Sequence, residues 1–284
     1  MDIADIMIAG IGGGLGAALG YLIAGLIPRK EGSTGLGLRG VVAIVLAVVG
    51  MRVMPPVIDP YIGPALRGSL GSDVGGDIDA LFAENPLMVA MSEVDPEAHA
   101  NMRIRVVEAY EAGGMSAARD AAIQEGMVLG QQAVLTYAPR ADDDTVIGFQ
   151  RAVLGTARGM MSEPRLCYAM MYSSVAPQNV DPEDIARAGG HPASAGMQDA
   201  MVALIRAAGS EVVAYDADFA AAGMGELQMH VLQNYSDEQI RYFSGYAPRN
   251  DGEYAQACGT MIDLLQYQLN HDYAIDMIRA GFSG

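Results

Sequence analysis

Residues 6–28 read IMIAGIGGGLGAALGYLIAGLIP, a continuous run without a charged side chain. An α-helix needs about 20 mainly apolar residues to cross the roughly 30 Å hydrocarbon core of a bilayer. Glycine disfavours a helix in water, but in lipid the backbone must bond to itself, and glycine then offers a surface for close packing. The run is therefore predicted to be a transmembrane helix that holds the rest of the chain at a membrane.

Small residues cover one face of this predicted helix, opposite a stripe of Ile and Leu. Gly12, Gly16 and Gly20 follow the GxxxG spacing that lets two helix backbones touch, and Ala24 continues the face. This face packs either on the next helix of the same chain or, since it is wide enough for two neighbours, on other subunits. Within residues 6–28 a phosphate-binding glycine loop is excluded, because neither GxGxxG nor GxxxxGK[ST] occurs in this run.

A second apolar run, centred on VVAIVLAVVG at residues 41–50, predicts a second membrane helix at about 38–58. Its charge-free centre is too short to span, so the helix must continue past Arg52, whose side chain either reaches the headgroups or pairs with a buried partner. Its own small stripe is formed by Gly40, Ala43, Ala47 and Gly50. Residues 1–58 are thus predicted to form a transmembrane hairpin.

The charges at the membrane edges predict the orientation of this hairpin. Arg29, Lys30 and Arg39 lie between the two helices, whereas the only charged residues in the tail before the first helix are acidic. The positive-inside rule places the loop at 29–39 in the cytoplasm and both ends on the other side. In a bacterial inner membrane the N-terminus and the large C-terminal domain are then periplasmic. The acidic tail and long apolar run are unlike a cleaved signal peptide.

The net charge of −17, from 34 acidic and 17 basic side chains, belongs entirely to residues 61–284, because residues 1–60 are neutral. An acidic domain repels phosphate backbones, so nucleic acid is excluded as a partner. Lys30 is the only lysine, which excludes Schiff-base and P-loop chemistry from the large domain. The partners that remain are membrane lipid and other protein subunits.

The chain has two cysteines, Cys167 and Cys258, the number needed for one disulfide. An oxidising compartment such as the periplasm favours a bond between them. Two separately buried thiols are the alternative.

Beyond a Pro- and Gly-rich linker or collar at 59–76, residues 77–284 show helix start signals and no strand alternation, which predicts an all-α fold. The start signals pair a capping residue with proline, or follow capping-box spacing. They are Asn85-Pro86, Asp95-Pro96, Asp181-Pro182, Ser236 with Gln239, and Asn250 with Glu253. The predicted helices are 77–83, 86–93, 96–112, 116–137, 143–161, 164–173, 182–188, 194–208, 210–222, 225–234, 237–245 and 251–280.

One tetrapeptide, YAPR, occurs at 137–140 and again at 246–249. Each copy follows a predicted helix and precedes a polar cap and another helix. Both copies are therefore predicted to form the same helix–turn–helix corner. The repeat is compatible with a multi-helix soluble domain made of two helical lobes.

Residues 85–171, with the DPE cap, the YAPRADDD corner and a late LCY, resemble uncharacterised, membrane-anchored, all-helical envelope proteins of Gram-negative bacteria. This resemblance covers less than half of the chain. It implies an envelope location and no activity.

A search for catalytic and metal-binding patterns finds no specific motif. The four histidines form no HExxH, and GxSxG, CxxC and CxxCH are absent. Three consecutive Asp at 142–144 read as a helix cap rather than a calcium loop. Sulfur-rich residues at 160–171 read as core packing rather than a Cu(I) site. The histidines are His99, His191, His230 and His271. No cofactor or metal is expected.

The sequence predicts a non-enzymatic, membrane-anchored structural or accessory protein. It would assemble through its glycine-rich helices as a homo-oligomer or as a subunit of a larger inner-membrane complex. One alternative is a periplasmic module that binds a cation or a basic protein. Another is a hydrolase whose site is assembled from distant helices.

Overall fold

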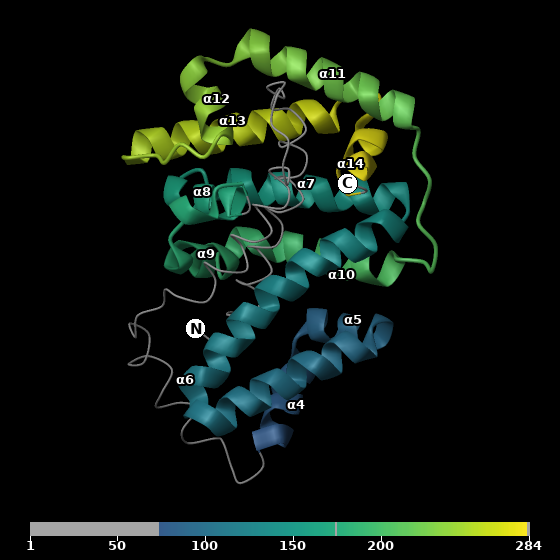
Figure 1. Cartoon of the computed structure of the whole chain (residues 1–284), viewed down its shortest axis with the longest axis vertical. Helices are drawn as coiled ribbons and strands as arrows, with labels where there is room; N and C mark the ends of the chain where they lie inside the picture. Colours follow the sequence, from purple (N-terminus) through teal and green to yellow (C-terminus); the bar gives the residue numbers. More distant parts are fainter. Residues whose placement is uncertain (1–73, 174, 283–284) are drawn as a thin grey trace, which may run out of the picture.

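The structure is a computed structural model that describes residues 74–173 and 175–282 (Figure 1). The predicted hairpin, its packing residues and its edge charges at 29–52 lie outside the described residues. Within the described part, every regular element is helical, which confirms the all-α prediction there. None of these helices combines the length and the apolar character needed to cross a membrane.

The elements follow one another along the chain with short connections. They are α4 (Val74–Glu84), α5 (Pro86–Val94), α6 (Pro96–Tyr137), η1 (Ala138–Arg140), α7 (Asp143–Gly159), α8 (Pro164–Tyr172), η2 (Pro177–Asn179), α9 (Pro182–Gly189), η3 (Pro192–Ser194), α10 (Ala195–Ala207), α11 (Ala217–Asn234), α12 (Asp237–Phe243), α13 (Asp251–Leu269) and α14 (Ala274–Phe282). The elements labelled η are single 3-10 turns.

The predicted capping residues begin the helices as expected. The Asn85 side chain accepts the Leu87 N–H at 2.9 Å, and Asp95 accepts the Ala98 N–H at 3.0 Å. Ser236 and Gln239 form a capping box at the start of α12. These bonds satisfy amide groups that a helix leaves unpaired in its first turn. The local sequence therefore fixes where these helices start.

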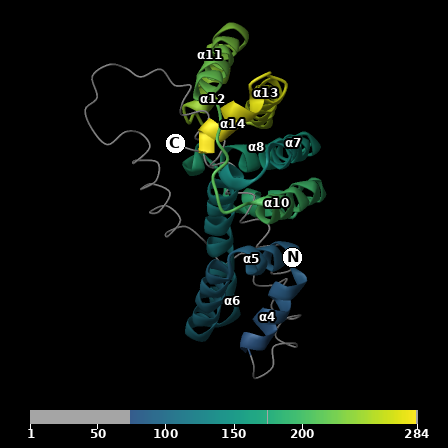
Figure 2. The same cartoon turned by 90° about the vertical axis from the view of Figure 1, so that its right-hand side faces the viewer.

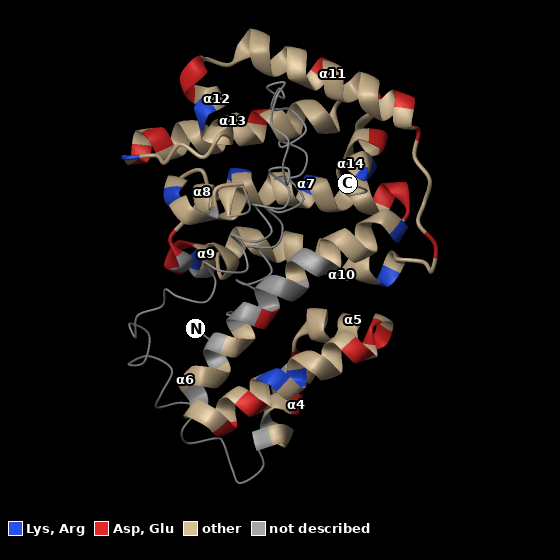
Figure 3. Ribbon diagram, viewed as in Figure 1, with Lys and Arg blue, Asp and Glu red and all other residues tan. Residues whose placement is uncertain are grey.

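Acidic residues gather at helix starts, which accounts for part of the negative charge (Figure 3). The first turns of α7, α9, α12 and α13 each carry two acidic side chains. Negative charge there complements the partial positive charge of the helix N-terminus.

Helix α6 is bent sharply, and its two arms meet at an angle (Figure 1). Gly114 has a left-handed φ of 69° and a ψ of −158°, outside the helical region. The sequence predicts two helices, 96–112 and 116–137, and the break between them falls at this glycine. Only a residue without Cβ adopts this φ without strain.

Three of the predicted helix boundaries are wrong. The helices predicted at 210–222 and 225–234 form one continuous helix, α11. Residues 208–216 are not helical, and α11 starts at Ala217 rather than at Ser210. The Gly209 N–H donates to the Arg140 carbonyl at 3.0 Å, and the Val213 N–H donates to the Pro139 carbonyl at 2.8 Å. Bonds to η1 thus replace helical bonds in this segment. The predicted helix at 251–280 is two helices, since α13 ends at Leu269 and α14 begins at Ala274.

The helices stack in layers from α5 at one end to α11 at the other. α5 packs on α10, α10 on α7, α7 on α13, and α11 on α13 and α14. Seen from the side, α10, α7, α13 and α11 lie one above the next (Figure 2). This order brings segments that are distant in the sequence into one stack.

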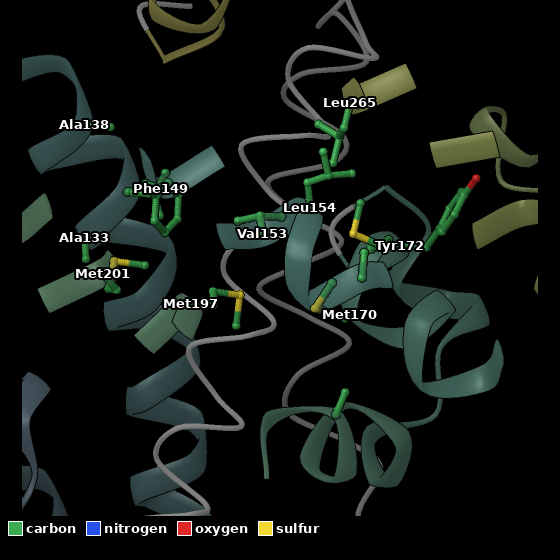
Figure 4. Packing of buried hydrophobic residues seen from close by; sticks show 14 of the residues in the cluster. Ala133, Ala138, Phe149, Val153, Leu154, Met170, Tyr172, Met197, Met201 and Leu265 are labelled. Atoms are coloured by element: carbon green, nitrogen blue, oxygen red, sulfur yellow. The ribbon is translucent and has the colours of Figure 1, made fainter. Parts of the chain in front are cut away.

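The hydrophobic core lies along α7. Phe149, Val153 and Leu154 of α7 are buried among Met197 and Met201 of α10 and side chains of α8 and α13 (Figure 4). Methionine fills irregular gaps between helices because its side chain is long and unbranched. The high methionine content of this part is thus largely core packing.

The one large cation deep in this part of the chain is Arg279 of α14, whose side chain is 2% exposed. It donates to the Ala141 carbonyl at 2.8 Å, to Asp143 at 2.6 Å and, more weakly, to the Pro139 carbonyl at 3.4 Å. A guanidinium carries five N–H groups and can serve several acceptors at once. Arg279 therefore fixes α14 to the corner that follows α6.

The two YAPR copies do not form the same corner, so that prediction is wrong. The copy at 137–140 continues α6 as η1, and Ala138 is fully buried. The copy at 246–249 is irregular and follows Gly245, which has a φ of 84°. The likeness of the two copies is confined to the sequence.

Candidate functional site

Cys167 of α8 and Cys258 of α13 are joined in a disulfide, with their Cα atoms 5.9 Å apart. Both side chains are completely buried. Tyr172, one turn beyond Cys167, donates its hydroxyl to the Ala257 carbonyl at 3.0 Å. The bond therefore sits in a closed interface, and the structure brings together the two cysteines singled out from the sequence.

Tyrosines surround this disulfide. The rings of Tyr168 and Tyr172 stack with centroids 4.5 Å apart, and Tyr254 meets Tyr168 edge-on at 5.1 Å. Burial raises the pKa of Tyr168 to about 12 and that of Tyr172 further. Both hydroxyls thus keep their protons at neutral pH and do not act as bases.

A groove of about 380 Å³ runs between α11 and Tyr267 of α13. His230 stacks on the Tyr267 ring with centroids 3.9 Å apart. Its Nε2 atom lies 3.5 Å from an Asp263 oxygen, which also accepts the Tyr235 hydroxyl at 2.8 Å. The lining residues are Ala222, Gly225, Glu226, Met229, His230, Gln233, Asn234 and Tyr267.

A second histidine pairs with a carboxylate beside this groove. His271 Nε2 lies 3.0 Å from Glu226, and its Nδ1 accepts the Tyr273 N–H at 3.1 Å. Because Nδ1 accepts a backbone proton, the neutral ring carries its proton on Nε2 and donates it to Glu226. None of the lining residues of the groove is Ser, Thr or Cys.

The remaining histidines lie elsewhere. His99 meets Phe82 edge-on at 5.4 Å, and burial lowers its pKa. His191 accepts the Ala193 N–H at 3.1 Å and lies 3.3 Å from Glu163. In the part of the chain that the structure describes, no three metal-ligating side chains come together.

The possible calcium and copper residues have other partners. Asp142 accepts the Thr145 N–H at 2.8 Å and the Thr145 hydroxyl at 3.0 Å, as the cap of α7. These two bonds hold the pKa of Asp142 below its usual range. Asp143 pairs with Arg279, and Cys167 is bonded to Cys258 rather than available to a metal.

A second cavity, of about 310 Å³, was not predicted from the sequence. It lies where the α5–α6 junction, the end of α6 with η1, and the exit of α10 meet. The lining residues are Val94, Asp95, Thr136, Tyr137, Arg140, Ala208, Gly209 and Ser210. The sequence gives Asp95 as a cap and Arg140 as part of YAPR, but offers no signal that the two share a cavity.

In comparisons with known proteins, no family model, no curated protein and no solved structure matches this chain. The resemblance to envelope proteins therefore remains a prediction. So do the packing roles of Gly12, Gly16, Gly20, Ala24, Gly40, Ala43, Ala47 and Gly50.

Proposed function

We propose that the protein is a membrane-anchored structural or accessory protein of the bacterial inner membrane. Residues 1–58 would hold an acidic helical domain on the periplasmic side and assemble through their small-residue faces. The observation that carries this proposal is the uncharged, glycine-rich run at 6–28, placed ahead of a helical domain whose core is closed by a disulfide.

Two features of the described domain support a scaffolding role. The disulfide between Cys167 and Cys258 links α8 to α13 in its core. Arg279 holds α14 to the corner that follows α6. Such a domain holds its shape while it is presented to a partner. A disulfide also persists in the periplasm and rarely in the cytoplasm, which favours the orientation expected from the loop charges.

A second candidate, a module that binds a basic protein, is favoured by the surface of α11. Phe219, Met229 and Leu232 are 48%, 51% and 60% exposed. Glu226 lies on the same helix and faces the groove. Exposed apolar side chains beside acidic ones suit a partner that is both apolar and basic. Binding of this kind would weaken as salt rises. For the hydrolase alternative, the groove offers histidine–carboxylate pairs, with no Ser, Thr or Cys among its lining residues.

The assembly test replaces Gly16 and Gly20 with Leu in the full chain, which is then extracted in mild detergent. Native mass measurement should show a defined oligomer or complex for the unchanged chain and a smaller species for G16L/G20L. The matched control, Leu19→Ile and Leu22→Ile, alters the bulky face instead and should keep the assembly. A lone monomer from the unchanged chain, or an unaltered size for G16L/G20L, would contradict the proposal.

The orientation test uses the two cysteines. In intact cells that express the chain, thiol alkylation before and after reduction should label Cys167 and Cys258 only after reduction. Cys258→Ser should leave Cys167 open to labelling in the denatured chain without reduction. Full labelling of the unreduced, denatured chain would argue against a periplasmic domain.

A further inference from the structure

The cavity between Asp95, Arg140 and the exit of α10 is built from three distant segments that are tied to one another. Arg206 at the end of α10 pairs with Glu93 of α5 at 2.9 Å and 3.3 Å. The Gly209 N–H donates to the Arg140 carbonyl at 3.0 Å. Arg279 donates to the Ala138 and Pro139 carbonyls of η1 at 3.5 Å and 3.4 Å. These contacts tie the segments that form the walls of the cavity to one another and to α14.

Arg140 is half-buried and lines this cavity. Within the described residues, no carboxylate lies within 4.0 Å of its guanidinium, whereas Arg206 and Arg279 each have a carboxylate partner. The Arg140 guanidinium is therefore open to pairing with an anionic group of a ligand. A ligand carboxylate would supply two oxygens to it in the bidentate geometry that arginine favours.

Asp95 provides the opposite charge in the same cavity. One carboxylate oxygen accepts the Ala98 N–H at 3.0 Å, and the other faces the Tyr137 hydroxyl at 3.4 Å. Burial and the Asp95 charge raise the pKa of Tyr137 to about 12, so that hydroxyl keeps its proton and remains a donor. A carboxylate has about four acceptor sites, so Asp95 can accept further hydrogen bonds.

We propose that this cavity binds a small zwitterion of the amino-acid type, with its carboxylate on Arg140 and its ammonium on Asp95. A simple anion would be opposed by Asp95, and a simple cation would be opposed by Arg140, so a ligand that carries both charges is favoured. Val94 and Ala208 give the walls an apolar part that suits a short aliphatic body. The space of about 310 Å³ is at the small end of ligand sites.

Equilibrium dialysis of the full chain in non-ionic detergent tests this site with isotope-labelled probes. L-alanine, β-alanine and γ-aminobutyrate separate the two charges by increasing distances, and acetate and methylamine each carry one charge. At least one zwitterion should bind saturably, with a Kd in about the millimolar range. Acetate and methylamine should bind at least ten times more weakly.

Three variants make the assignment specific. Arg140→Met and Asp95→Asn should each weaken zwitterion binding at least tenfold, and Asn replaces Asp as a cap without loss of the helix start. Arg151→Met is the control, because Arg151 is exposed on α7 and away from the cavity. Binding that is unchanged in R140M and D95N, equal binding of acetate or methylamine, or no saturable binding by any zwitterion would overturn the proposal. If R140M fails to fold, D95N alone decides.

Discussion

At 137–140 the tetrapeptide YAPR continues α6 as the 3-10 turn η1, whereas at 246–249 the same residues form an irregular link between α12 and α13. The first copy is half-buried or buried throughout, and the second exposes Ala247 and Arg249. Four identical residues thus take two conformations, because each copy meets different partners.

The partners of the first copy come from far along the chain. Arg279 donates to the Ala138 and Pro139 carbonyls at 3.5 Å and 3.4 Å, and the segment at 208–216 donates two N–H groups to η1. With its carbonyls satisfied in this way, the turn can remain buried.

The partners of the second copy are mainly local. Gly245 ends α12 with a left-handed φ of 84°, and the Tyr246 N–H donates back to the Arg241 carbonyl at 3.1 Å. Arg249 pairs with Glu253 at 2.9 Å and lies over the Tyr246 ring, both on the surface. The second corner is therefore stabilised by a glycine with a positive φ, whereas the first corner is stabilised by a buried arginine.

The largest effect is expected from Arg279→Met, which removes the long-range contact at the first corner. In this variant the Ala138 and Ala141 carbonyls stay buried, and the Ala141 carbonyl loses its charged donor. The free energy of unfolding should therefore fall by about 3 kcal/mol. Urea denaturation of the full chain in non-ionic detergent, followed by near-UV circular dichroism of tyrosine, measures it. Arg249→Met at the second corner should change little. A larger loss in R249M than in R279M would reverse the comparison.

An intermediate effect is expected from Gly245→Ala. Alanine at a φ of 84° is strained, and its Cβ would lie 3.3 Å from the Gln178 side chain, so the loss should be about 1–2 kcal/mol. Gly155 lies on an exposed face in the middle of α7, where an added Cβ meets no atom within 4 Å. Gly155→Ala should instead raise the free energy of unfolding by about 0.5–1 kcal/mol. The same denaturation assay gives both values. Stabilisation by G245A would show that the second corner does not depend on its glycine.

The smallest effect is expected from Asp142, the cap that follows the first corner. Asp142→Ala should cost about 1 kcal/mol at pH 7. Thr145 lowers the pKa of Asp142 in the folded chain, so the stability from this carboxylate is present above its unfolded pKa of about 3.9 and is lost as pH falls further. The difference between the unchanged chain and D142A should therefore shrink between pH 5 and pH 2.

Asn250 cannot serve as a neutral control, because its side chain donates to Glu253 at 3.2 Å and helps to lower the pKa of that carboxyl. The control is Asn85, the cap of α5, which accepts the backbone N–H groups of Leu87 and Met88. The loss in Asn85→Ala should keep its size at low pH, apart from changes shared with the unchanged chain. Loss of the D142A difference at pH 7, or an equal pH dependence in the two variants, would contradict this assignment.

Local signals in the sequence were sufficient for much of the fold. Asn85-Pro86, Asp95-Pro96 and the Ser236 box predict helix starts that the structure has, because a cap acts within four residues. Gly114 ends a helical stretch through its own backbone conformation, which is also a local effect. The start of α11 was predicted wrongly, since the N–H groups of Gly209 and Val213 donate to carbonyls of η1 instead of forming helical bonds.

The candidate sites also differ in how far the sequence could predict them. The cysteine count allowed one disulfide but left two separately buried thiols as the alternative, and the structure has the bond. Arg279 lies in an amphipathic stretch where a sequence predicts a surface charge, and its acceptors lie about 140 positions earlier in the chain. The cavity of Asp95 and Arg140 depends on three segments meeting, so no spacing in the sequence could reveal it.

The disulfide also decides how the domain responds to mechanical tension. Cys167 and Cys258 are 91 positions apart, and the bond closes everything between them into a covalent ring. When Val74 and Phe282 are pulled apart, the force passes through the sulfur atoms and bypasses the ring. About 300 Å of extensible chain stays hidden, at roughly 3.3–3.6 Å per residue. Until it is reduced, the domain can be drawn out only from the segments outside the ring.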